Sequence, residues 1–480
     1  METGIDVKDV IVVGFGGGGV AAALALAEGG AKVIAFEKML VPGGLTNFIE
    51  GTYAVESEIL LKRNIKATRD EGFRELMDYS HWRANPNLVR AIVDKSGDTI
   101  SWLETYGVPF EEPSADFFGG PRVWHLFRGF GSAMIHALLP HALAKGVEIH
   151  YETAVKKLLR KGDGPVTGVV VEDKEGKQRE VQANAVIIAT GGYGNNKEWV
   201  KKYTGRNLDE DIVCAVPYNK IGEGIKMAWE AGASEEGTGV LLLGPGTIPG
   251  LPPVSHLNAA SAQPTLWINR NGVRFCDETI ILNMIHAGNA LLRQPGGIVF
   301  TIFDGDMKRH WEEFGGLNFG NYLPARTRLA KLDEEITASI QQGSPYVFAA
   351  DTLDELADKI GVDKAAFKKT VEEYNGFCAK GHDDRYDKDQ MYLRPVRTPK
   401  FYAFKCMPQF LGTMGGIKIN ERTEVLDNSQ KVIPGLYAVG NDAGGMYGDS
   451  YCVITSGIAS AFAINGGRIA AENALKYIGR

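Results

Sequence analysis

The sequence has little cysteine and no block of basic residues, and both absences argue against whole classes of function. Its five cysteines lie far apart and form no Cys-x-x-Cys pair, so neither a zinc site nor a dithiol redox pair is expected. A reducing, cytoplasmic location is the simpler interpretation. Lysine and arginine number 52 against 59 acidic residues, for a net charge of −7. Without clustered positive charge, binding to nucleic acid is not expected.

A long uninterrupted apolar run is also missing. Residues 10–27 carry no charge, but "GFGGGG" interrupts them and the preceding "METGIDVKD" is acidic rather than basic. A strand, a turn and a helix explain this stretch better than a signal peptide or a membrane anchor. We therefore expect no membrane insertion. At 480 residues the chain predicts two or more domains.

Glycine, by contrast, is abundant at 59 residues, and it gathers in short runs. The first run follows the apolar stretch Val10–Val13 and reads Gly14-x-Gly16-x-x-Gly19 before an Ala/Leu-rich helix. Such glycines permit a tight turn and a close approach of the backbone to a pyrophosphate at the helix N-terminus. A second strand, residues 32–36, ends at Glu37, which is placed to accept from ribose hydroxyls. The unit predicts a dinucleotide-binding fold.

Three more glycine-rich segments lie far apart in the chain. "MLVPGGLTNFIEGTYAV" covers residues 39–55, "ANAVIIATGGYGNN" covers 183–196, and "VIPGLYAVGNDAGG" covers 432–445. The last two each join a predicted strand to a pair of glycines. Segments this distant indicate a large, extended cofactor that two parts of the chain contact.

Together these motifs resemble the flavoproteins of the fumarate reductase/succinate dehydrogenase type, which include 3-ketosteroid dehydrogenases and urocanate reductase. The likeness also includes "GEGIKMAWEAGA" (222–233), "INRNGVRFCDE" (268–278), "TMGGIKI" (413–419) and "GRIAAENA" (467–474). It implies FAD and an α/β fold, with a Rossmann-like FAD-binding domain split in sequence and an inserted α+β capping domain. We expect the first part at 1–235, the capping domain at 236–398 and the second part at 399–480. The charged stretch 381–390 is expected to be a surface loop or hinge.

The residues expected to contact FAD lie in the glycine-rich segments and beside them. They are Gly14, Gly16, Gly17, Gly19, Glu37, Lys38, Gly43, Gly44, Thr46, Asn47, Glu50, Gly51, Val155, Ala189, Thr190, Gly191, Gly192, Asn195, Gly440, Asn441, Ser456, Gly457 and Ile458. Covalent relatives carry a histidine in the second glycine-rich loop. No histidine lies between residues 39 and 55, so the FAD is expected to be non-covalent.

The resemblance also implies where substrate chemistry takes place. The histidine that carboxylate-reducing members use as a substrate ligand falls on Gly412, and one of their arginines falls near Tyr451. Their acidic relay residue aligns with Glu278, but the relay arginine aligns with Leu282. Their proton-donating arginine falls on Lys308, with Arg309 adjacent. The loss of these groups disfavours fumarate as the substrate.

Tyr451, in "GDSYCVITSG", has a counterpart in the ketosteroid dehydrogenases, where a tyrosine hydroxyl and a glycine amide hold a ketone oxygen. A neutral phenol suits a ketone, whereas an arginine suits a carboxylate. Tyr451 could also only pack on the flavin or the cap. Lys308 and Arg309 could be solvated helix residues, and Glu278 could only cap or pair structurally. Further candidate acids are Tyr193, Tyr322, Tyr346 and Tyr447, whereas His125, His256 and His286 stand alone.

Three functions stay open from the sequence. The first is an FAD-dependent ene-reductase or dehydrogenase of an α,β-unsaturated ketone, which could be steroid-like. The second is an acrylate or dicarboxylate reductase that uses Arg309 or Arg128 as a carboxylate ligand. The third is a flavin electron-transfer subunit. Each needs an electron donor or acceptor, and the enzymes need a small-molecule substrate; the sequence identifies neither, nor the direction of the reaction.

Overall fold

The computed structural model describes residues 8–114, 120–216, 218–252, 254–317, 323 and 326–480, and the chain divides into two compact units. Unit 1 comprises Met1–Gly205, Val216–Leu242 and Gly412–Arg480, and unit 2 comprises Arg206–Ala215 and Leu243–Leu411. Strands β11 (Leu241–Thr247) and β15 (Phe401–Thr413) carry the chain from one unit to the other. The boundaries expected at 235/236 and 398/399 lie earlier in the chain than those at 242/243 and 411/412, and the expected division did not separate Arg206–Ala215, which belongs to unit 2.

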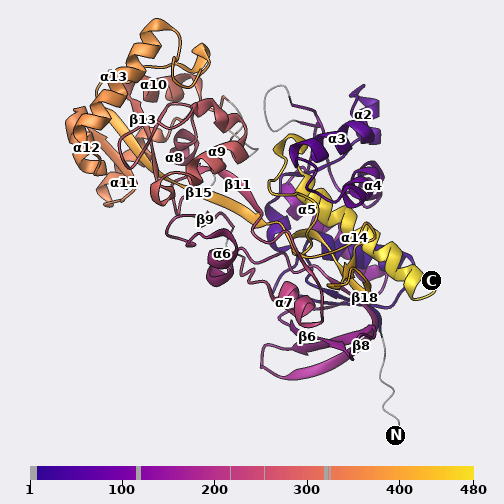
Figure 1. Ribbon diagram of the computed structural model, residues 1–480. Coiled ribbons are helices and arrows are strands. Elements are labelled where there is room, and N and C mark those ends of the chain that lie inside the picture. Colours follow the sequence, from indigo (N-terminus) through magenta and orange to yellow (C-terminus); the bar gives the residue numbers. More distant parts are fainter. Residues whose placement is uncertain (1–7, 115–119, 217, 253, 318–322, 324–325) are drawn as a thin grey trace. The chain divides into compact units, whose positions relative to one another are not determined.

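Unit 1 is built on an eight-stranded sheet (Figure 1). Six of its strands follow the order β17-β18-β8-β1-β2-β5. The other two are β7, which pairs with β8, and β6, which pairs with β7. The pairs β18–β8, β8–β1, β1–β2 and β2–β5 are parallel. Strand β2 is apolar and buried along its whole length, and the last four residues of β1 and of β8 are as well, because both faces of the sheet are covered there. Their bounds are β1 (Lys8–Val13), β2 (Val33–Phe36), β5 (Glu148–His150), β6 (Ala154–Arg160), β7 (Val166–Glu172), β8 (Gln178–Ile188), β17 (Glu424–Leu426) and β18 (Val432–Ala438).

Helix α14 (Ile458–Tyr477), the last of the chain, packs closely against α1 (Gly17–Glu28), the first. A Cβ added at Gly467 would lie 2.3 Å from the carbonyl oxygen of Gly18, so this contact requires glycine. Both helices and α5 (Phe130–Ala144) contribute to one core with strands β1, β2 and β8. The two parts of unit 1 that the sequence separates are thereby joined in one hydrophobic core.

The other elements of unit 1 are short or lie outside the sheet. They are β3 (Gly51–Tyr53), α2 (Glu58–Lys62), α3 (Arg69–Tyr79), α4 (Pro86–Thr105), β4 (Trp124–Leu126), α6 (Lys197–Thr204), α7 (Glu223–Glu230), β10 (Glu235–Glu236) and β16 (Gly416–Ile417), with 3-10 turns η1 (Gly44–Phe48), η5 (Gly440–Asp442) and η6 (Val453–Thr455). Strands β3 and β4 form an antiparallel pair, and β10 pairs with β16.

Unit 2 has a six-stranded sheet in the order β11-β15-β13-β12, with β14 and β9 also paired to β15. Side chains alternate between its faces, so the odd residues Val299 and Phe303 enter one core and the even residues Phe300 and Ile302 enter another. The first core includes residues of α8, α10 and α11, and the second includes residues of α12 and α13. The elements are β9 (Val213–Cys214), α8 (His256–Ser261), β12 (Leu266–Asn269), η2 (Glu278–Leu282), α9 (Met284–Leu292), β13 (Val299–Asp304), α10 (Gly305–Phe314), α11 (Leu332–Gln341), β14 (Val347–Ala350), α12 (Leu353–Ile360) and α13 (Lys364–Lys380).

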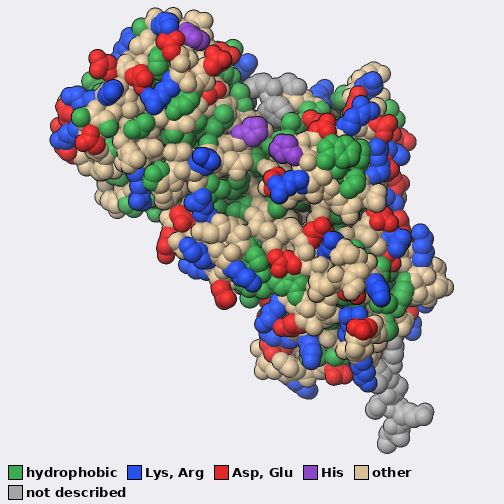
Figure 2. All heavy atoms as spheres, viewed as in Figure 1, with side chains coloured by type: hydrophobic (Ala, Val, Ile, Leu, Met, Phe, Trp, Pro, Cys, Tyr) green, Lys and Arg blue, Asp and Glu red, His purple; other side chains and the backbone are tan. Residues whose placement is uncertain are grey.

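Acidic and basic side chains are interspersed over the face that Figure 2 shows, with no large area of one sign. Within the described part of the chain, no helix is long and apolar enough to cross a membrane.

Candidate active site

The turn between β1 and α1 is shaped for close contact with a ligand. Gly14 has φ +91°, and a Cβ there would lie 2.5 Å from the carbonyl oxygen of Ala189. A Cβ at Gly19 would lie 2.1 Å from the carbonyl oxygen of Gly14. Both positions therefore require glycine. The resulting turn presents the N-terminus of α1, whose amide groups suit a pyrophosphate.

The second glycine-rich loop lies directly against this turn. The hydroxyl of Thr46 accepts a hydrogen bond of 2.9 Å from the amide of Gly17. The amide of Gly43 donates to the carbonyl oxygen of Phe15 at 2.8 Å. The structure thus places the loop that contains Gly43 and Thr46 against the turn Gly14–Gly19. That these residues, with Gly44 and Asn47, contact one cofactor stays a prediction.

Glu37 follows β2 at the same edge of the sheet and is only 8% exposed. Its carboxylate accepts from the amides of Phe15 at 2.8 Å and Met39 at 2.9 Å. Burial raises the pKa of Glu37 above its ordinary value, and the two amide donors oppose that rise. Each oxygen keeps a further lone pair, which suits a ribose hydroxyl. The amide of Thr153, next to β6 and Val155, donates to the carbonyl oxygen of Glu37 at 3.0 Å.

Asp442 links two of the distant glycine segments and is a residue that no sequence motif marked as functional. It is completely buried, and its carboxylate accepts from the amides of Gly191 at 3.1 Å and Gly192 at 2.9 Å. The hydroxyl of Thr190 donates to it at 3.0 Å, and so does the Thr190 amide. The only signal in the sequence is an acid inside "GNDAGG", next to the predicted Gly440 and Asn441. Its importance follows from the parallel pairing of β8 with β18, which brings their following loops together.

The other expected cofactor residues lie in unit 1 near the ends of its strands and helices. Lys38 pairs with Glu223 at 2.7 Å, and Asn195 exchanges hydrogen bonds with the backbone of Lys220. Glu50 and Gly51 lead into β3, whereas Ser456, Gly457 and Ile458 form the start of α14. A direct contact of each with the cofactor stays a prediction.

The loop before α14 is held in place by residues before α4. Arg83 forms an ion pair with Asp449, and the amide of Asn85 donates to the carbonyl oxygen of Gly445 at 2.7 Å. At its end, Gly457 has φ +82°, and a Cβ there would lie 2.7 Å from the amide nitrogen of Tyr53. The loop therefore has one tightly defined backbone path.

Tyr451 is buried in this loop, 4% exposed, beside the ring of Tyr447 with a centroid distance of 5.6 Å. The hydroxyl of Tyr447 and the indole nitrogen of Trp124 are buried and have no hydrogen-bond partner among the described residues. Trp124 also lies next to Gly457, since a Cβ there would be 2.8 Å from its ring. Close glycines and buried polar groups without partners fit a large polar cofactor at this end of unit 1.

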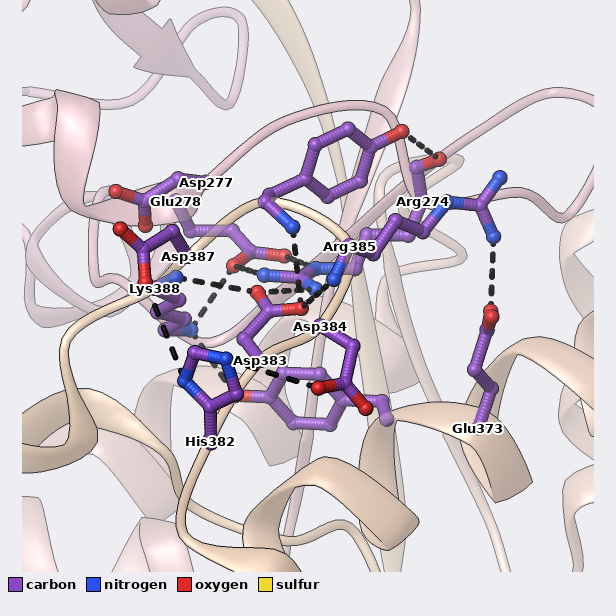
Figure 3. Close-up of polar contacts among 12 residues, drawn as sticks. Arg274, Asp277, Glu278, Glu373, His382, Asp383, Asp384, Arg385, Asp387 and Lys388 are labelled. Carbon is purple, nitrogen blue, oxygen red and sulfur yellow. Dashed lines mark hydrogen bonds and ion pairs between the residues drawn. The ribbon is translucent and has the colours of Figure 1, made fainter.

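The three other candidate catalytic residues lie in unit 2, and Glu278 is fully enclosed there. Its carboxylate receives the guanidinium of Arg274 at 2.8 and 2.9 Å and the ammonium of Lys388 at 2.9 Å (Figure 3). All three side chains are buried. Glu278 therefore has a structural role, because its carboxylate compensates the charges of two buried cations. Its catalytic role stays a prediction.

The charged stretch 381–390 contributes to the same network, which corrects the interpretation of it as a purely surface loop. Asp383 is 1% exposed and pairs with Arg274 at 2.7 Å, and Lys388 is also buried (Figure 3). Two positive and two negative side chains therefore balance inside unit 2. Buried charges persist only with partners of this kind.

Lys308 and Arg309 lie on α10. Lys308 pairs with Glu312 at 2.8 Å and with Asp333 at 2.9 Å, whereas Arg309 is exposed and pairs with Asp306. Both side chains are therefore engaged in ion pairs within unit 2, and a catalytic role for either stays a prediction. Arg128, the alternative carboxylate ligand, is exposed in the turn after β4.

The remaining candidates are placed as follows. Tyr193 is buried and accepts from the amide of Gly239 at 2.9 Å. His125 is buried and contacts the hydroxyl of Ser57 at 2.7 Å, and His256 accepts from the amide of Lys331. Tyr346 lies in unit 2 beside Lys405, and His286 is in α9. Tyr322 lies outside the described residues.

Comparison with known proteins decides the cofactor. The family described as FAD binding domain matches residues 9–451. The chain belongs to this family. The protein is therefore a flavoprotein that binds FAD. That the nucleotide turn, Glu37 and the Asp442 contacts hold this FAD, and that its attachment is non-covalent, stay predictions.

Relatives of this flavoprotein define its chemistry. It is 36% identical to vinyl phenol reductase of Lactiplantibacillus plantarum, over 98% of this chain and 97% of the relative. Among solved structures it is similar to a flavocytochrome fumarate reductase in an open conformation (TM-score 0.75, 27% identity, covering 99% of this chain and 80% of that one). It also shares its fold with 3-ketosteroid Δ1-dehydrogenase of Sterolibacterium denitrificans (TM-score 0.79, 21% identity, 98% and 100%). The protein is thus an FAD-dependent oxidoreductase of C=C or CH–CH bonds, with an FAD-binding domain and a capping domain.

Proposed function

We propose that this flavoprotein reduces a vinyl C=C bond that is conjugated with a phenol. The observation that carries the proposal is the match along both whole chains to vinyl phenol reductase. It agrees with a buried tyrosine, Tyr451, near the place where the resemblance puts an arginine of the family's carboxylate reductases. It also agrees with Gly412, where the resemblance puts their substrate-binding histidine. A neutral hydroxyl suits a phenol or a ketone better than a carboxylate.

The phenol and the enone expected from the sequence share one requirement. In both, an oxygen conjugated with the C=C bond changes its charge as the bond is reduced. In a vinylphenol, a proton added to the terminal carbon draws electrons from the phenol oxygen, which releases its own proton. A hydride added to the benzylic carbon returns those electrons, and the oxygen regains a proton. The site must therefore stabilise this oxygen in both its forms.

Tyr451 is the residue that we assign to this oxygen. Its hydroxyl both donates and accepts hydrogen bonds, so it can follow the change from phenol to quinone-methide carbonyl and back. The neighbouring Tyr447 is a second candidate, because burial raises its pKa well above the ordinary value and keeps its hydroxyl protonated. When bound, FAD supplies the hydride, after an electron donor has reduced it. The five free cysteines agree with a reducing compartment such as the cytoplasm.

The test compares substrates under anaerobic conditions with reduced methyl viologen as the donor. We expect 4-vinylphenol to be reduced to 4-ethylphenol faster than cyclohexenone, acrylate or fumarate. The matched control is 4-vinylanisole, which keeps the ring and the alkene but has no ionisable hydroxyl, and it should react at least about a hundredfold more slowly. Equal rates for 4-vinylphenol and 4-vinylanisole, or a preference for fumarate, would contradict the proposal.

A further inference from the structure

Unit 2 contains a pocket of about 310 Å³ whose lining includes none of the residues discussed above as catalytic candidates. Its walls include Phe300 of β13, Phe348 of β14 and Ile360 at the end of α12, together with the cations Arg270, Lys359 and Lys405. The volume is at the small end of the range for ligand sites, which is about 300–1,000 Å³.

The register of the sheet explains why these side chains share one face. Phe300 lies directly opposite Lys405 in the antiparallel pair β13–β15, and Phe348 lies opposite Ala403 in the pair β14–β15. Ala403 and Lys405 are two residues apart, so all of these side chains project to the same side. This is the side that α12 and α13 cover, and the pocket opens where α12 ends.

The three cations are unusual because none of them has a carboxylate within salt-bridge distance among the described residues. The ammonium of Lys359 donates to the carbonyl oxygen of Ala349 at 2.7 Å. It also lies in the last turn of α12, where a positive charge balances the helix dipole. Arg270 and Lys405 therefore carry the positive charge that no carboxylate or helix dipole compensates.

Lys405 and Arg270 act on one another. Burial lowers the pKa of Lys405, and repulsion by Arg270 lowers it further, with no carboxylate opposing either effect. The ammonium of Lys405 lies 5.7 Å from the ring centre of Tyr346. An anion between the two cations would relieve this repulsion, and the planar guanidinium of Arg270 suits a carboxylate or a phosphate.

From this geometry we propose that the pocket binds a small aromatic anion, in which one ring packs against Phe300 and Phe348 and a carboxylate or phosphate group binds Arg270 and Lys405. Phe300 and Phe348 would contact the ring, and the cations Arg270 and Lys405 would recognise the charge. This site is separate from the flavin chemistry, and the proposal does not depend on the substrate assigned above.

The test is titration calorimetry on the FAD-loaded full chain with phenyl phosphate and with benzoate, which distinguish an aryl phosphate from an aryl carboxylate. Phenol and inorganic phosphate are the two partial ligands, which offer only the ring or only the charge. We expect at least one aromatic anion to bind roughly tenfold or more tightly than either partial ligand. The tighter of the two identifies the anionic group.

Two substitutions locate the binding in this pocket. Arg270→Met and Lys405→Met should each weaken the binding roughly tenfold or more, while FAD content, melting temperature and turnover stay at wild-type values. The matched control is Lys369→Met, which removes an exposed lysine of α13 outside the pocket and should change nothing. Unchanged affinity in both pocket variants, equal binding of phenol, or no binding up to about 10 mM would each overturn the proposal.

Discussion

The carboxylate of Asp442 accepts hydrogen bonds from both the amide and the hydroxyl of Thr190, across 252 positions of sequence. Two further amides, of Gly191 and Gly192, complete the contact. The loop after β8 is therefore held to the loop after β18 by one buried acid. Because FAD contacts in this fold come from several strand ends, their relative placement depends on this acid.

Asp442→Asn should impair FAD binding. The substitution keeps the size of the side chain but replaces one acceptor oxygen with an NH2 group that faces amide donors. A buried donor left without a partner costs about 1–3 kcal/mol, so the melting temperature should fall and FAD should be lost on gel filtration. The matched control is Asp387→Asn, at a side chain that is 93% exposed. Full FAD content with an unchanged melting temperature would show that the contact is dispensable.

Glu37→Ala should weaken FAD retention by a different route. It removes the acceptor for the amides of Phe15 and Met39 and the predicted acceptor for the ribose, while the glycine turn keeps its sequence. A hydrogen bond to a charged group contributes about 1.5–3 kcal/mol. The FAD remaining after dialysis should fall well below that of wild type and of Glu175→Ala, which alters an exposed acid in a turn. Retention equal to the control would place the ribose elsewhere.

Tyr451→Phe tests the assignment of the substrate oxygen. The substitution keeps the buried ring and its contact with Tyr447 but removes the hydroxyl. The loss of one hydrogen-bond donor to a developing charge typically lowers kcat on the order of 10²–10³-fold. We expect that decrease with 4-vinylphenol, at normal FAD content and melting temperature. Tyr477→Phe, which alters a tyrosine 44% exposed, is the control. If kcat is unchanged, Tyr451 only packs; if FAD is lost, it contacts the cofactor.

His125 should make the fold sensitive to acid. Burial lowers its pKa from 6.5 to about 4, so it stays neutral in the folded state but becomes protonated in the unfolded state below about pH 6.5. Stability is thus fully present above pH 6.5 and decreases as the pH falls toward 4. One proton corresponds to about 1.4 kcal/mol per pH unit, or about 2 kcal/mol between pH 6.5 and 5.

The measurement for His125 is the melting temperature between pH 7 and 5. His125→Gln should be less stable at pH 7, because it loses the contact with Ser57, but should show a smaller decrease on acidification. His382→Gln, at a side chain 56% exposed, should retain the wild-type decrease. The same pH dependence in His125→Gln and wild type would assign the acid sensitivity to other groups.

Lys388→Met should destabilise unit 2 strongly, because it leaves Glu278 with uncompensated charge in a buried site. Removing one partner of a buried ion pair costs about 3–5 kcal/mol. Adding Glu278→Leu should recover part of the loss, since the remaining pair of Arg274 and Asp383 is neutral. Lys380→Met, at an exposed pair, is the control. If Glu278→Gln instead lowers kcat without changing the melting temperature, Glu278 acts in catalysis after all.

The sequence by itself determined the nucleotide-binding unit and the fold class. The strand, the glycines and Glu37 lie within about 30 consecutive residues, so their spacing alone predicts the turn and its ligand. Tyr451 could also be selected as a candidate from the sequence, because the motif that contains it is a local stretch of the chain. These features are confined to short segments, where neighbours in the chain are also neighbours in space.

Only the tertiary structure decided which distant residues act together. Asp442 became significant because the parallel pairing of β8 and β18 brings two loops to one edge, and no local pattern records that pairing. Glu278 matched a catalytic motif, yet its carboxylate is enclosed by Lys388, which lies 110 positions later. The pocket beside Lys405 likewise depends on the register of three strands. Burial and charge compensation are properties of the packed chain, so sequence spacing could not reveal them.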